Sequence, residues 1–114
     1  MKVGFIGLGN VGGKLAWSLL RNNFDLTVRD LDKNLTQSFK NSGAKVANSP
    51  KELAEQVDLI ITCLPSPKIC AEVMEASDGV INGLSENKIW LEMSTTDEAE
   101  IKRISKKIIS KKAI

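Results

Sequence analysis

A chain of 114 residues, 42% of them hydrophobic, can bury one core. A nucleotide-binding domain with a separate substrate domain would need about 250 residues. The net charge of +2, with both signs interspersed, lacks the basic patch of a nucleic-acid-binding protein. No apolar run approaches the roughly 20 residues of a membrane-spanning helix, and the N-terminus opens directly into a strand rather than a signal peptide. We therefore expect a cytoplasmic protein that binds neither nucleic acid nor membrane.

Predicted strands and helices alternate along the whole chain. The expected strands cover residues 2–6, 26–29, 45–47, 58–64 and 88–93. The expected helices cover residues 10–22, 31–41 and 50–55, then about ten residues after Pro67, and a last stretch from about residue 97. The first helix would bury Val11, Leu15, Leu19 and Leu20 on one face. This order predicts an α/β fold, a Rossmann-type doubly wound parallel sheet filling residues 1–114, with no second domain.

A glycine-rich turn joins the first strand to the first helix. It reads Gly7-Leu8-Gly9-Asn10-Val11-Gly12. In a dinucleotide-binding fingerprint, Gly7 allows a sharp turn, Gly9 leaves room for a pyrophosphate, and Gly12 lets the helix pack on the strand. The helix N-terminus would then face the phosphates with free N–H groups and its positive dipole end. The alternative is a strand–helix–strand unit whose glycines serve packing only.

The residues that end the second strand bear on which dinucleotide binds. Asp30 lies 18 residues past Gly12, where a carboxylate can accept hydrogen bonds from ribose hydroxyls and repel a 2′-phosphate. This favours NAD over NADP. Strand alternation points the neighbouring Arg29 away from Asp30, and we expect it to face solvent. An inward-turned Arg29 would instead stack on adenine or reach a phosphate, which keeps NADP open.

The residues that the chain lacks narrow its chemistry. It contains no His and no Tyr, so neither can serve as the acid or base of a hydride transfer. No lysine lies in an apolar run that would lower its pKa toward neutrality. Cys63 and Cys70 match no metal-binding spacing and are too few for a disulfide framework, so we expect both to be reduced. We therefore expect the catalytic group to lie outside these residues.

Three segments together resemble the N-terminal domain of the β-hydroxyacid dehydrogenases. They are the run from Val3 to Gly12, the strand end Ile61-Thr62-Cys63-Leu64-Pro65, and Glu92-Met93-Ser94-Thr95. This family includes 3-hydroxyisobutyrate dehydrogenase and relatives of 6-phosphogluconate dehydrogenase. The resemblance spans nearly the whole chain, with the motifs in the family's order and spacing.

The resemblance implies roles for two pairs of residues. Leu64 and Pro65 would lie along the cofactor ribose, while Ser94 would contact substrate and Thr95 the nicotinamide. A helix cap is the plainer alternative for the Ser-Thr pair, with Thr95 and Glu98 forming a capping box. The implied activity is hydride transfer between a nicotinamide cofactor, NAD or NADP, and a small hydroxy acid such as 3-hydroxyisobutyrate. The intact enzyme would be a homo-oligomer.

The sequence also departs from the family pattern. Glu92 replaces an aspartate, Glu98 replaces a proline, and Ser18 replaces an asparagine. In the family the catalytic lysine lies on a helix that would follow Ile114, so the chain is expected to be a dehydrogenase fragment. Two other functions stay open. One is a non-catalytic dinucleotide-binding module with a regulatory or interaction role, and the other is an imine or ketone reductase relative that replaces the lysine.

Overall fold

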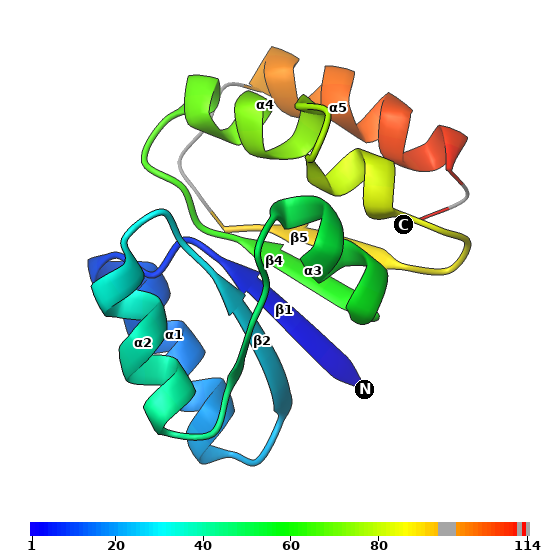
Figure 1. Cartoon of the computed structure of the whole chain (residues 1–114). Coiled ribbons are helices and arrows are strands. Elements are labelled where there is room, and N and C mark those ends of the chain that lie inside the picture. Colours follow the sequence, from blue (N-terminus) through cyan, green and yellow to red (C-terminus); the bar gives the residue numbers. More distant parts are fainter. Residues whose placement is uncertain (94–97, 112, 114) are drawn as a thin grey trace.

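A computed structural model describes residues 1–93, 98–111 and 113 of the chain. Its centre is a parallel sheet in the order β3-β2-β1-β4-β5 (Figure 1). The strands are β1 (Lys2–Ile6), β2 (Asp25–Arg29), β3 (Lys45–Val46), β4 (Leu59–Thr62) and β5 (Ile89–Glu92). β1 pairs with both β2 and β4, so the strand order reverses beside it. This arrangement confirms the predicted Rossmann-type α/β fold.

Helices cover both faces of the sheet. They are α1 (Asn10–Arg21), α2 (Lys33–Asn41), α3 (Pro50–Gln56), α4 (Pro67–Glu75), α5 (Glu98–Ser110) and the short 3-10 helix η1 (Val80–Gly83). Figure 1 shows α1 and α2 on one side of the sheet and α3, α4 and α5 on the other. Among the described residues, no helix is long and apolar enough to cross a membrane.

Strand alternation divides the buried residues between two cores. Phe5 and Ile61 pack with Phe39 of α2 on one face, whereas Ile6 and Ile60 pack with α3, α4 and α5 on the other. Both faces of β1 and β4 are thus covered, which fits the continuously apolar sequence Leu59-Ile60-Ile61 of β4.

Local sequence signals account for several helix ends. Ser49 and Ser66 cap α3 and α4 through hydrogen bonds to Glu52 and Ile69 N–H, with a proline in the first turn of each helix. Gly43, at φ +107°, follows the end of α2 in the left-handed region that favours glycine.

Several boundaries differ from the prediction. Helix α2 begins at Lys33 rather than at residue 31, because the Asp32 side chain accepts the Asn34 N–H and makes Asp32 the cap. Strand β4 ends at Thr62 rather than at residue 64. Its neighbour β1 ends at Ile6, opposite Thr62, so β1 has no further strand residues to pair with residues 63 and 64. Val11 is not on the buried face of α1, and 65% of its surface is exposed.

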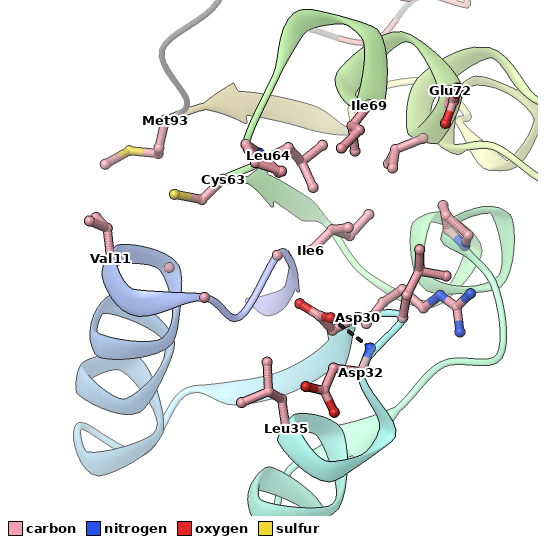
Figure 2. Close-up of a pocket in the computed structure, with 18 of the residues that line it drawn as sticks. Ile6, Val11, Asp30, Asp32, Leu35, Cys63, Leu64, Ile69, Glu72 and Met93 are labelled. Carbon is pink, nitrogen blue, oxygen red and sulfur yellow. Dashed lines mark hydrogen bonds between the residues drawn. The ribbon is translucent and has the colours of Figure 1, made fainter.

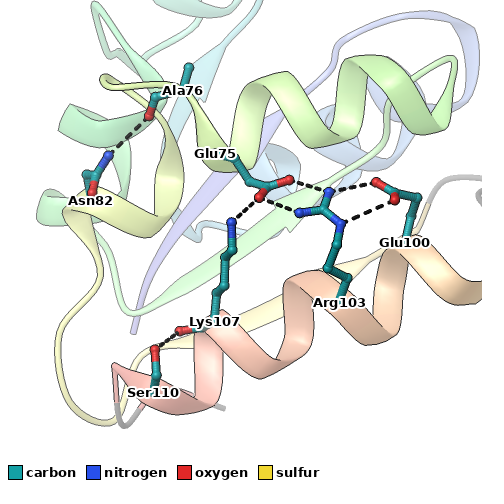
Figure 3. Close-up of polar contacts among 7 residues, drawn as sticks. All are labelled: Glu75, Ala76, Asn82, Glu100, Arg103, Lys107 and Ser110. Atoms are coloured by element: carbon teal, nitrogen blue, oxygen red, sulfur yellow. Dashed lines mark hydrogen bonds and ion pairs between the residues drawn. The ribbon is translucent and has the colours of Figure 1, made fainter.

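Helix α5 is held against α4 by apolar and ionic contacts. Ile104 and Ile108 are buried in the core. Arg103 and Lys107 both form ion pairs with Glu75 of α4 (Figure 3). The proposed capping box of this helix includes Thr95, which lies outside the described residues.

Candidate dinucleotide site

A pocket of about 1100 Å³ opens above the carboxyl ends of β1, β2 and β4. Open α/β sheets bind their ligands at this position, where the strand order reverses. Three structural parts line it: the glycine turn after β1, the segment after β2, and the segment from β4 through α4 (Figure 2).

Two of the three motif glycines are required by the protein's own packing. Gly7 has φ +101°, and a side chain there would overlap the carbonyl oxygen of Cys63. A side chain on Gly12 would overlap the carbonyl oxygen of Gly7, since α1 starts so close to β1. Both glycines therefore serve the turn and the helix–strand contact predicted for them.

Gly9 differs from these two glycines, because no described protein atom lies close enough to require a residue without a side chain there. A Cβ added to Gly9 would meet nothing within 4 Å among the described atoms, and its φ of −66° is open to any residue. Gly9 is also the N-cap of α1 and gives that helix no side-chain cap, so the first N–H groups stay available. Empty space beside free N–H groups and a positive helix dipole suits a phosphate group.

The carboxylate of Asp30 is held in place at the pocket wall. One of its oxygens accepts the Leu8 N–H at 2.7 Å and the other accepts the Asp32 N–H at 2.8 Å. Figure 2 shows the contact with Asp32. Each carboxylate oxygen has a second lone pair, so Asp30 can still accept hydrogen bonds from hydroxyl groups. The same carboxylate thus orders the glycine turn and faces the pocket.

The sequence favours a solvent-facing Arg29, and in the structure this partly buried residue also lines the pocket. Val28 packs on the α1–α2 side of the sheet, so Arg29 lies on the opposite side. The pocket reaches that side too, since Pro50 of α3 and Val73 of α4 also line it. Arg29 therefore borders the pocket from the α3–α4 side of the sheet.

Leu64 and Pro65 line the pocket, as the resemblance implies. Cys63, Val11 and Met93 border the same end, and Figure 2 shows their side chains near one another. Ser94 and Thr95 lie outside the described residues, so their predicted roles rest on the sequence.

Residues of α4 form a wall that sequence reasoning missed. Ile69, Glu72, Val73 and Ala76 line the pocket at helical spacing. Leu31, Asp32 and Leu35 after β2 also line it. The spacing on α4 is visible in the sequence, but only the position of β2 beside β1 reveals which face of α4 meets the pocket.

Below the pocket, a polar network joins β4, β5 and α4. Glu92 accepts hydrogen bonds from the Thr62 hydroxyl at 2.7 Å and the Cys70 thiol at 3.0 Å. Trp90 donates to the Thr62 hydroxyl at 2.9 Å. Burial, together with Glu92, raises the pKa of Cys70 to about 12, and burial and the Glu92 charge also raise the pKa of Cys63.

Residues 2–114 match the protein family described as the NAD binding domain of 6-phosphogluconate dehydrogenase. The chain belongs to this family. It is 36% identical over 106 residues to the mitochondrial 3-hydroxyisobutyrate dehydrogenase of Mus musculus, covering 93% of this chain and 32% of that protein. It thus spans about a third of the length of that curated relative.

The chain is also similar to two proteins that are not named as hydroxyisobutyrate dehydrogenases. The cytokine-like nuclear factor N-PAC of Pongo abelii is 28% identical over 110 residues, covering 96% of this chain and 20% of that protein. The structure of an imine reductase from Pseudomonas sp. superposes with a TM-score of 0.88 at 26% identity, covering 99% of this chain and 38% of that one.

Proposed function

We propose that this chain binds NAD within a dehydrogenase that transfers hydride between the nicotinamide and a small hydroxy acid similar to 3-hydroxyisobutyrate. The observation that carries the proposal is the open space at Gly9 beside the uncapped N-terminus of α1. If the glycines served packing only, nothing in the described structure would account for a glycine at position 9. The names of relatives such as the mouse protein support the substrate class.

Each part of the dinucleotide has residues suited to it. The pyrophosphate would lie on the N–H groups at Gly9, Asn10 and Val11, and the adenosine ribose would donate hydrogen bonds to Asp30. The nicotinamide would lie toward Leu64, Pro65 and the Ser94-Thr95 pair, with Ser94 on the substrate. The bound nicotinamide supplies the hydride acceptor, while these residues bind and orient it.

The catalytic acid or base is proposed to lie outside this chain. The described lining of the pocket contains no Lys, and the sequence contains no His or Tyr. A further domain of the intact protein would supply that group and the rest of the substrate site. The homo-oligomeric state and the cytoplasmic location stay predictions, and the name of the mouse relative gives that protein a mitochondrial location.

Calorimetric titration with NADH tests the proposal. We expect weak binding, with a dissociation constant in about the millimolar range, because we propose that a further domain completes the nicotinamide site. Gly9→Val should abolish binding, since its side chain would fill the space of the pyrophosphate. Ser85→Val, in an exposed loop, places the same side chain away from the pocket and should bind as the unaltered protein does. Absence of any heat with NADH or NADPH at these concentrations contradicts the proposal.

A non-catalytic module is the second candidate. The likeness to a protein named as a nuclear factor favours it, because that name denotes no dehydrogenase. Such a module would bind the dinucleotide through the same glycine turn. An intact protein that binds NADH yet turns over neither hydroxy acids nor imines would support this candidate against the dehydrogenase and against the imine reductase alternative.

A further inference from the structure

A carboxylate lies directly behind one end of the pocket wall. Glu92, the last residue of β5, accepts hydrogen bonds from the Thr62 hydroxyl at 2.7 Å and from the Cys70 thiol at 3.0 Å. The residues that follow Thr62 and Glu92 in the chain are Cys63 and Met93, and both line the pocket. The two hydrogen bonds therefore hold the charge of Glu92 close to the Cys63–Met93 end of the pocket.

The pocket wall at this end is apolar. It is formed by Val11, Cys63, Leu64, Pro65 and Met93. Apolar groups screen a charge less than water does. Burial and, after it, the negative charge of Glu92 raise the pKa of the Cys63 thiol, so the field of this carboxylate reaches the wall.

The charged residues that line the pocket itself lie elsewhere. Its described lining includes the carboxylates of Asp30, Asp32, Glu72 and Asp78, which belong to the segment after β2, to α4 and to the turn beyond α4. Figure 2 shows Asp32 and Glu72 away from Cys63 and Met93. Arg29, the one basic residue of the described lining, lies at the end of β2. None of these charges belongs to the apolar end of the pocket.

In the proposed site, the apolar end receives the nicotinamide. Asp30 would hold the adenosine ribose on the β2 side of the glycine turn, so the other half of the dinucleotide would extend past the turn toward Cys63 and Met93. The nicotinamide ring of NAD⁺ carries a positive charge, and addition of a hydride ion gives NADH, whose ring is neutral. A fixed negative charge nearby therefore attracts the oxidised ring and not the reduced one.

We propose that Glu92 favours NAD⁺ over NADH through the attraction between its carboxylate and the positively charged nicotinamide. This inference rests on the proposed NAD site. It adds a residue behind the pocket wall that selects the oxidation state of the cofactor without touching it. Such a preference assists the oxidation of a hydroxy acid, which begins with bound NAD⁺ and ends with the release of NADH.

The test compares the affinities of NAD⁺ and NADH for the 114-residue chain and for Glu92→Gln. NMR titration measures both affinities, because it resolves weak binding. Glutamine keeps the length of the side chain and an acceptor oxygen, but it removes the charge. We expect the ratio of NAD⁺ to NADH affinity to fall about fivefold, the scale of one charge acting across a pocket that is open to water. Glu92→Asp keeps the charge and should keep the ratio within about twofold.

A matched variant separates a local charge from the net charge of the chain. Glu86→Gln removes the same charge from an exposed loop and should leave the ratio unchanged. An unchanged ratio in Glu92→Gln, or equal falls in Glu92→Gln and Glu86→Gln, overturns the inference and leaves the NAD site standing. Failure of both dinucleotides to bind the unaltered chain overturns the NAD site and this inference together.

Met93 offers a second variant that does not disturb the buried network. Its surface is 46% exposed, so Met93→Lys can place a positive charge beside Glu92 without burying it. The ratio of NAD⁺ to NADH affinity should then fall relative to the neutral variant Met93→Gln, as it does in Glu92→Gln. If Glu92→Gln does not fold, equal ratios in Met93→Lys and Met93→Gln overturn the inference.

Discussion

The hydroxyl of Thr62 donates a hydrogen bond of 2.7 Å to the carboxylate of Glu92, joining the last residues of β4 and β5. Thr62 is fully buried and also accepts from Trp90. Its hydroxyl therefore satisfies a carboxylate and an indole that have little access to water. β5 leads directly to Ser94 and Thr95, so this bond fixes the strand end from which the implied substrate loop departs.

Thr62→Val should lower the free energy of unfolding by about 2 kcal/mol, because it removes the acceptor of the Trp90 indole N–H and one of the donors to Glu92. Urea unfolding measures this change. Thr36→Val is the matched control, since the Thr36 hydroxyl bonds only the Lys33 carbonyl of its own helix, and it should cost about 0.5 kcal/mol or less. Equal losses in the two variants would contradict the role given to Thr62.

The two cysteines should differ in their reaction with N-ethylmaleimide. Cys70 is buried and its pKa is raised to about 12, so it stays a protonated, inaccessible thiol at pH 8. Cys63 borders the pocket and is only partly buried, so it should react, although slowly because its pKa is raised. Mass spectrometry of the native protein should find one modified cysteine, and none in Cys63→Ser. NADH should slow the modification, and an unchanged rate at saturating NADH would argue against a nicotinamide beside Cys63.

Acid should weaken the attachment of α5 to α4. Hydrogen bonds from Arg103 and Lys107 lower the pKa of Glu75 from 4.5 to about 2. A carboxylate with a depressed folded-state pKa stabilises the protein above its unfolded pKa, and this contribution is lost as the pH falls from about 4.5 to about 2.

Glu75→Gln tests this linkage. At pH 7 the variant should be less stable by about 1 kcal/mol, the scale of a partly exposed ion-pair network. The difference should shrink toward zero near pH 2, where Glu75 of the unaltered protein is becoming protonated. Chemical unfolding at both pH values measures it, and a difference independent of pH would show that the ion pairs do not contribute.

Asp30→Asn should shift cofactor preference toward NADPH. The variant keeps one acceptor for the backbone N–H groups but removes the charge that repels a 2′-phosphate, and Arg29 borders the same pocket. We expect the ratio of NADPH to NADH affinity to rise about tenfold. Asp25→Asn, at the opposite end of β2, removes an equal charge and should leave the ratio unchanged. Parallel losses for both cofactors would assign Asp30 to the glycine turn alone.

The chain by itself should not turn over hydroxy acids. Loss of a general acid or base typically costs about 10²- to 10⁴-fold in rate, and loss of the substrate contacts proposed for a further domain would add to this. Absorbance at the NADH band with 3-hydroxyisobutyrate and NAD should therefore stay at background. Steady NADH formation that Ser94→Ala abolishes would place the catalytic group within these residues.

The sequence predicts the parts of the site that depend on local chemistry. The roles of Gly7 and Gly12 follow from spacing along one strand, turn and helix, and the structure confirms them. The position of Arg29 could not be derived in this way, because strand alternation gives its direction but not the extent of the pocket on that side. Two other parts of the site depend on contacts between residues far apart in the chain, which no local pattern encodes. They are the wall formed by α4 and the polar network of Thr62, Cys70, Trp90 and Glu92.

The position of β1 in the sheet has a consequence for how the chain holds together. β1 lies between β2 and β4 in the sheet. In the described part of the chain, β4 and β5 therefore join the rest of the sheet through the pairing of β4 with β1. The pocket lies over this seam, with the glycine turn on one side and Cys63 through Ala76 on the other. A ligand in the pocket loses its contacts whenever either half opens. Binding would therefore couple the two halves, and amide hydrogen exchange in β4 and α4 should slow as the ligand concentration rises.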